Sequence, residues 1–213
     1  TPVDFALVLD ESGSMKKPRP DGSIEGANGS KAFAHQLVSQ YTLGIDESRF
    51  SVVSFAENAT TRVPWSYNVT VINAGIDAMT ADGRTSISDG FEAVRHLFAN
   101  DGRVNATKIV LLLSDGEQTI DAATGKTLLE TAVEAAALVK GDNVTVFAWG
   151  FGDVNASTLQ QIATDPSKAI LASNLAELTR YLDRLKDKLC IGEIETPAFF
   201  DPPSPPPPPP PPS

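Results

Sequence analysis

The sequence predicts an α/β fold: a doubly wound, mostly parallel sheet of six strands, one of them an antiparallel edge strand, flanked by helices in a Rossmann-like arrangement. Three features lead to this prediction. Short, continuously apolar runs alternate with amphipathic helical segments, as in a parallel sheet covered on both faces. Two of these runs end in oxygen-rich turns, at the sheet edge where ligands bind in such folds. The 213 residues suffice for one sizeable core.

Six segments are predicted to be strands. The first (VDFALVL) and fourth (KIVLLL) are almost wholly apolar, which is typical of strands buried on both faces. The second and third form a hairpin, which supplies the antiparallel edge strand. The segments are 3–9, 49–56, 60–64, 108–113, 144–149 and 169–172.

Helical spacing of apolar residues predicts the helices between these strands. They cover residues 31–43, 68–79, 88–99, 128–140 and 159–163, and a last helix carries leucines at 175, 178, 182, 185 and 189. This pattern places the folded domain at residues 1–190. The remaining residues, 191–213, contain an uninterrupted run of eight prolines, which predicts a polyproline II linker or stalk.

Small oxygen-bearing side chains are concentrated in three loops. Asp10, Ser12 and Ser14 follow the first strand, Thr85 lies in a Gly-x-Thr loop, and Asp115 follows the fourth strand. Residues at i, i+2 and i+4 of a tight loop can converge on one point. Hydroxyl and carboxylate oxygens suit Mg²⁺, Mn²⁺ or Ca²⁺, whereas zinc and copper usually take thiolate or imidazole. Each motif alone also fits an ordinary turn, but their order along the chain is much more specific.

With these motifs the chain resembles the von Willebrand factor A domain, which is also seen as the inserted domain of integrins. The resemblance rests on residues 10–14 (DESGS), 83–86 (GRTS), 112–116 (LLSDG) and 147–153 (FAWGFGD). It implies a metal-ion-dependent adhesion site at the carboxyl edge of the sheet. By resemblance, Ser12, Ser14 and Thr85 would give hydroxyls to the ion, and Asp10 and Asp115 would act directly or through water.

The resemblance also implies a function. We expect an extracellular adhesion or ligand-binding module in which a divalent cation, Mg²⁺ before Ca²⁺ or Mn²⁺, bridges to a Glu or Asp carboxylate of a protein partner. Two alternatives stay open. In the first, the module is structural, in the extracellular matrix or a cell wall, and the ion only stabilises the loops. In the second, an intracellular protein of the same fold works beside an ATPase, which the sequons and the polyproline run argue against.

Composition and missing motifs exclude several other functions. The net charge of −10 disfavours binding to nucleic acids or acidic lipid surfaces, and no apolar run is long enough to insert into a membrane. No pairing of a nucleophile with a general base is evident, so we do not expect an enzyme.

Glycosylation sequons indicate a secreted or cell-surface protein. Six of the nine asparagines begin Asn-x-Ser/Thr sequons, where the Ser and Thr content predicts about 1.4 by chance. They are Asn28, Asn58, Asn68, Asn105, Asn143 and Asn155. Cys190 is the only cysteine, so it either pairs with a partner outside this sequence or remains a free thiol.

One segment departs from the family pattern. Residues 15–30 separate the first motif from the first helix and are predicted to form a long loop with Lys16, Lys17 and Arg19 near the ion. The loop is either a solvated insertion or a basic segment that selects acidic ligands.

Overall fold

The computed structural model describes residues 2–16, 22–183 and 185, and its centre is a six-stranded sheet. The strands lie in the order β3-β2-β1-β4-β5-β6. β3 is antiparallel to β2, and all other neighbours are parallel, which confirms the predicted fold class. The strand bounds are β1 Val3–Asp10, β2 Ser48–Phe55, β3 Ala59–Ser66, β4 Thr107–Ser114, β5 Thr145–Phe151 and β6 Ala169–Ala172.

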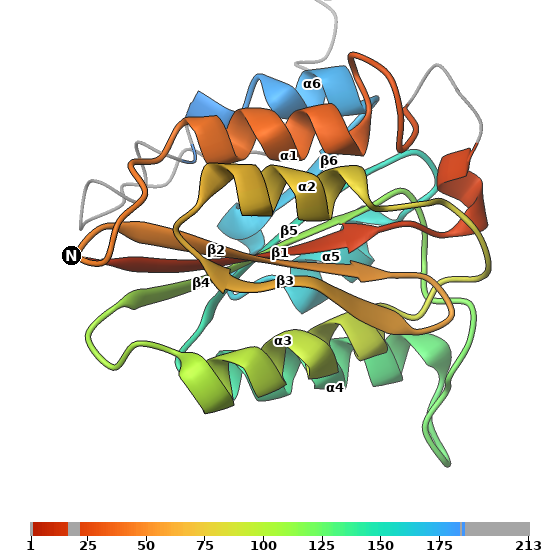
Figure 1. The fold of residues 1–213 in the computed structure, drawn as a ribbon. Helices are drawn as coiled ribbons and strands as arrows, with labels where there is room; N and C mark the ends of the chain where they lie inside the picture. The colour runs from red at the N-terminus through yellow and green to blue at the C-terminus, as the bar shows by residue number, and fades with distance from the viewer. Residues whose placement is uncertain (1, 17–21, 184, 186–213) are drawn as a thin grey trace, which may run out of the picture.

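Helices cover both faces of the sheet (Figure 1). Helices α1, α2 and α6 pack on one face, and α3, α4 and α5 pack on the other, so the buried apolar residues form two clusters separated by the sheet. Two short 3₁₀ helices, η1 and η2, lie in loops. The helix bounds are η1 Gly13–Lys16, α1 Ser30–Ser39, α2 Val69–Asp77, α3 Ile87–Asp101, α4 Leu128–Gly141, α5 Ala156–Ile162, η2 Pro166–Lys168 and α6 Leu175–Thr179.

Two predicted helices end early. The first stops at Ser39 instead of residue 43, because Leu43 forms a parallel bridge with Ser48 and the Ser48 amide donates to the Thr42 carbonyl, which ties this segment to the start of β2. The last predicted helix breaks after Thr179 at a turn, and helical residues resume at 182.

The leucine stripe of this last segment nevertheless packs as expected. Leu175, Leu178, Leu182 and Leu185 are all buried in one core cluster. Residue 189, Cys190 and the proline-rich residues 191–213 lie outside the described residues.

Parallel strands give the sheet two distinct ends. We call the end where the five parallel strands begin the amino edge, and the end where they finish the carboxyl edge. In Figure 1 the labelled N-terminus marks the amino edge, and η1 marks the carboxyl edge.

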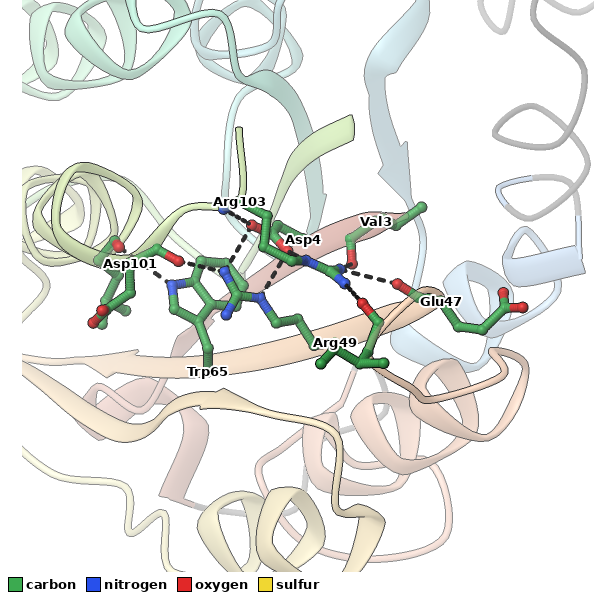
Figure 2. Close-up of polar contacts among 9 residues, drawn as sticks. Val3, Asp4, Glu47, Arg49, Trp65, Asp101 and Arg103 are labelled. Atoms are coloured by element: carbon green, nitrogen blue, oxygen red, sulfur yellow. Dashed lines mark hydrogen bonds and ion pairs between the residues drawn. The ribbon is translucent and has the colours of Figure 1, made fainter. Parts of the chain in front are cut away.

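A buried ion-pair network closes the amino edge (Figure 2). The Asp4 carboxylate is inaccessible to solvent and accepts hydrogen bonds from Arg49 Nε at 2.8 Å and from Arg103 Nε at 2.7 Å. Arg49 also lies 4.7 Å from the centre of the Trp65 ring and donates to the Asp101 carbonyl. This network joins β1, β2, β3 and the end of α3, so it holds the sheet in register far from the predicted metal ligands.

Candidate metal site

The three predicted loops meet at the carboxyl edge. Asp10 is the last residue of β1, and Asp115 directly follows β4, which is the neighbouring strand. The Thr85 loop reaches the first loop through backbone hydrogen bonds: the Gly13 amide donates to the Gly83 carbonyl at 2.8 Å, and the Asp82 amide donates to the Glu11 carbonyl at 2.9 Å. The fold therefore brings together segments that are about 100 residues apart in sequence.

Direct hydrogen bonds connect four of the five predicted ligands. The Ser12 and Ser14 hydroxyl oxygens are 2.9 Å apart, and the Ser14 hydroxyl donates to Asp115 Oδ1 at 2.7 Å. The Ser12 amide donates to Asp10 Oδ1 at 2.8 Å. These contacts run from the end of β1 to the end of β4 and place the four side chains in one cluster.

Thr85 joins this cluster through its loop. Its amide donates to Thr119 Oγ1 at 2.9 Å, and the Thr119 amide returns a 2.8 Å bond to the Thr85 carbonyl. Thr85 is buried. Thr119, which the sequence analysis did not single out, therefore holds the Thr85 backbone against the segment that follows Asp115.

Ser114 is a second residue of the site for which the sequence predicted no role, and it holds Asp10 in position. Its hydroxyl donates to Asp10 Oδ2 at 2.5 Å, so the two oxygens of Asp10 are held by Ser12 on one side and Ser114 on the other. In the sequence, Ser114 belongs to the LLSDG motif without a role of its own. The signal was available, because Ser114 immediately precedes Asp115 on the strand that neighbours Asp10.

Glu11 lies within the first motif, yet other groups occupy its carboxylate. Arg62 Nη2 donates to both carboxylate oxygens at 2.8 and 2.9 Å, Ser54 Oγ donates at 2.8 Å, and the Thr80 amide donates at 3.1 Å. The Glu11 carboxylate thus anchors the loop to β2, β3 and the segment before Thr85. Because its charge is paired with Arg62, Asp10 and Asp115 remain as the carboxylates of the cluster.

The two carboxylates are buried beside each other. Burial, together with the negative charge of Asp115, raises the pKa of Asp10 to about 6, against the opposing effect of hydrogen bonds from Ser114 and Ser12. A divalent cation between these groups would offset their repulsion. Two carboxylates and three hydroxyls make a hard, oxygen-only donor set, which fits Mg²⁺, Mn²⁺ or Ca²⁺.

The part of the chain that the structure describes offers no carboxylate-rich alternative site. Across the described residues, no group of three or more His, Cys, Asp or Glu side chains is arranged to hold a metal ion. A cation site built mainly on hydroxyls, as at the carboxyl edge, is the arrangement that remains in this part of the chain.

The two ends of the predicted loop at residues 15–30 pack into the fold, which the polar sequence did not predict. Met15 and Ile24 are buried in the core, and the Ile24 amide donates to the Met15 carbonyl at 2.9 Å, which closes the base of the loop. Lys16 lies 3.6 Å from the Asp82 carboxylate. Lys17 and Arg19 lie outside the described residues. Apolar anchors within a polar segment were the feature that the sequence interpretation overlooked.

The sequon asparagines are divided between the two edges of the sheet, and all six are exposed. The loops at the amino edge carry Asn68, Asn105 and Asn143, and those at the carboxyl edge carry Asn28, Asn58 and Asn155.

The sequence also matches a known protein family over most of its length. A sequence profile of the von Willebrand factor type A domain matches residues 4–184, which is most of the chain. The chain belongs to the von Willebrand factor type A domain family. The match includes all five predicted ligands, and the von Willebrand factor type A fold agrees with the observed strand order.

Curated relatives include chains of collagen VI. The chain is 24% identical to the mouse collagen alpha-4(VI) chain over 165 residues, covering 76% of this chain and 6% of the relative. It is 26% identical to the mouse collagen alpha-5(VI) chain over 193 residues, covering 88% of this chain and 7% of the relative. The chain therefore spans less than a tenth of these curated relatives.

Solved structures include relatives from matrix and surface proteins. Proximal thread matrix protein 1 from the mussel byssus, in a form whose metal-ion-dependent adhesion site is occupied by zinc, has a TM-score of 0.73 and 26% identity, covering 89% of this chain and 46% of that one. The pilus adhesin SpaC from Lactobacillus rhamnosus GG has a TM-score of 0.70 and 18% identity, covering 87% of this chain and 30% of that one. At this identity the comparison supports a shared fold and nothing further. Zinc in the byssus protein means that this kind of site is not restricted to the hard cations that the donor set favours.

Among the described residues, no helix is both long enough and apolar enough to cross a bilayer.

Proposed function

We propose that this domain is an extracellular, cation-dependent binding module. Its cation would be held by Ser12, Ser14 and Thr85, with Asp10 and Asp115 acting directly or through water. The observation that carries this proposal is the hydrogen-bonded cluster at the carboxyl edge, in which the hydroxyls of Ser12, Ser14 and Ser114 surround the carboxylates of Asp10 and Asp115.

The charge of this cluster points to the ligand. Glu11 is paired to Arg62, so Asp10 and Asp115 are the carboxylates near the proposed cation. When these two act through water, the side chains that contact the ion are neutral hydroxyls, and its charge is not cancelled by direct ligands. A cation whose charge is incompletely neutralised attracts a further anionic oxygen, which a Glu or Asp side chain of a protein partner can supply. Hard oxygen donors favour Mg²⁺ as the resident ion, with Ca²⁺ or Mn²⁺ as alternatives. The residues of this site would bind and orient rather than catalyse, so we propose no enzymatic activity.

Three observations support an extracellular location. Collagen VI chains and a byssus matrix protein are among the relatives, six sequons are present, and all six asparagines are exposed. We further propose that the domain comprises residues 1–190 and that residues 191–213 form a stalk, with Cys190 at their junction free to pair with another chain.

Titration calorimetry with Mg²⁺ tests the metal site. We expect one ion per chain for the wild type and no measurable heat of binding for Asp10→Asn or Ser12→Ala. The control is Asp82→Asn, which removes an exposed carboxylate from the same edge and should bind Mg²⁺ like the wild type. Equal binding by all four proteins would contradict the proposed ligands.

A structural role for the ion is the second candidate function, and the buried pair of Asp10 and Asp115 favours it, because a cation there relieves repulsion in the folded state. At one hundred times its dissociation constant, Mg²⁺ should stabilise the domain by about 2.7 kcal/mol. Both functions predict this gain. They differ in partner binding: an adhesive site loses a carboxylate ligand when EDTA removes the metal at a temperature where the domain stays folded, whereas a purely structural ion leaves any partner binding unchanged.

A further inference from the structure

Exposed apolar side chains gather at the amino edge, opposite the candidate metal site. Val104 is 93% exposed, Ile45 is 72% exposed and Tyr67 is 40% exposed. Arg103 connects them: it precedes Val104, its Nη1 donates to the Ile45 carbonyl at 2.6 Å, and its guanidinium carbon lies 6.0 Å from the centre of the Tyr67 ring. We call Ile45, Tyr67 and Val104 the amino-edge patch.

The network of Figure 2 fixes this patch in place. Arg103 also donates to the Asp4 carboxylate and to the backbone carbonyls of Val3 and Glu47, so its position is determined by four groups of the sheet and its loops. Because Arg103 is held in this way, the backbone at Ile45 and Val104 is fixed at the surface, and their side chains stay exposed to solvent. Apolar groups that are held exposed at one place on a protein usually have something to cover them.

Sequons flank the patch directly. Asn68 follows Tyr67, and Asn105 follows Val104, and both asparagines are exposed. Val69, which is 47% exposed, extends the apolar surface on the other side of Asn68. Two segments of the amino edge thus each pair an exposed apolar side chain with a glycosylation acceptor.

We propose that Asn68 and Asn105 carry N-linked oligosaccharides and that these cover the amino-edge patch. In the transfer, the Asn Nδ2 forms a bond to C1 of the first sugar of a polyprenyl-diphosphate oligosaccharide. The bond from C1 to the diphosphate oxygen breaks, the polyprenyl diphosphate leaves with the bonding electron pair, and the proton lost from Nδ2 passes to the released diphosphate or to water. A glycan is bulky and strongly hydrated, so it can shield neighbouring apolar groups from other proteins.

The local geometry accepts a glycan at both positions. Asn68 caps helix α2 through its side-chain oxygen, which accepts hydrogen bonds from the amides of Thr70 at 2.9 Å and Val71 at 3.4 Å. Attachment through Nδ2 leaves that oxygen free to cap the helix. Asn105 lies in the exposed turn between α3 and β4, and its sequon ends at the exposed Thr107.

Occupancy is measured on the full chain secreted from a eukaryotic cell. Peptide N-glycosidase in H₂¹⁸O converts each glycosylated Asn to ¹⁸O-labelled Asp, which tryptic mass mapping locates. We expect the label at Asn68 and Asn105 in most molecules. Absence of the label at either position would overturn the proposal, whatever the occupancy of the other four sequons.

Shielding is measured by comparing two double variants. Thr70→Ala with Thr107→Ala removes both sequons and keeps the Asn68 cap, whereas Thr70→Ser with Thr107→Ser keeps both sequons. Light scattering should show that the alanine variant associates, with its mean mass rising about twofold or more, and that the serine variant remains monomeric. Adding Ile45→Ser and Val104→Ser to the alanine variant should restore the monomer.

A second measurement does not depend on how the variants fold. Enzymatic removal of the glycans from the folded wild-type protein under native conditions should produce the same association. If the deglycosylated wild type stays monomeric, the glycans do not shield the patch and the proposal fails.

Discussion

Asp4→Asn should be among the most damaging single changes to this domain, although the residue is remote from the candidate metal site. The Asp4 carboxylate is fully buried and holds Arg49 and Arg103, and Arg49 is itself 8% exposed. Removing one partner of a buried ion pair leaves charges unpaired and costs about 3–5 kcal/mol. For a domain of this size each kcal/mol lowers Tm by about 2–4 °C, so the expected loss is about 6–20 °C.

Urea unfolding at pH 7, followed by circular dichroism, measures the loss of unfolding free energy, and thermal unfolding measures the drop in Tm. The control is Asp82→Asn, because the exposed Asp82 carboxylate lies 3.6 Å from Lys16 Nζ and its replacement should change the unfolding free energy by less than about 1 kcal/mol. A similarly small loss for Asp4→Asn would show that the buried network is not a main source of stability at the amino edge.

The same network predicts a pH dependence. Burial alone would raise the pKa of Asp4, but hydrogen bonds from Arg49 and Arg103 outweigh burial and hold it below its ordinary value. A carboxyl whose pKa is lower in the folded state stabilises the protein above its unfolded pKa, and that stabilisation is lost as the pH falls through the folded value. Below about pH 4 the unfolding free energy of the wild type should therefore fall toward that of Asp4→Asn. A difference between the two proteins that is unchanged at pH 2.5 would contradict this assignment.

Two further predictions concern the site and the core. Ser114→Ala removes the hydroxyl that donates to Asp10 Oδ2. Because groups that hydrogen-bond a metal ligand fix its position, titration calorimetry should show Mg²⁺ affinity lower by about 10-fold or more. Unchanged affinity would show that Asp10 is positioned without this hydroxyl. Gly90→Ala in α3 places a Cβ 2.8 Å from Val8 Cγ1 on the buried central strand, so chemical denaturation should show a net loss of about 1 kcal/mol or more; a gain would show that helix propensity outweighs the clash.

The six strands and the mostly parallel sheet could be predicted because continuous apolar runs and the turns that end them are local signals. All six strands appear within about two residues of their expected ends. The ends of two helices could not be predicted, because the helical spacing of apolar residues continues beyond both of them. Leu43 has the right spacing to continue α1, yet it pairs with Ser48, and this pairing is invisible to a helical pattern.

The candidate site shows the same division. Asp10, Ser12, Ser14 and Asp115 could be placed together from motif order and strand ends, and the structure brings them into contact. The partner of Glu11 could not be predicted, since Arg62 lies on another strand and its approach depends on the hairpin register.

The most direct test of the proposed function uses Mn²⁺ as the probe, since the bound ion reports its own coordinated water. Water-proton relaxation should rise when Mn²⁺ binds the wild-type domain, because at least one position on the ion is left to solvent. It should fall when acetate or a Glu-containing peptide displaces that water, and Ser12→Ala with Ser14→Ala should abolish both effects. If bound Mn²⁺ holds no exchangeable water, or carboxylates leave the relaxation unchanged, the ion is fully enclosed by the chain and does not bridge to a partner.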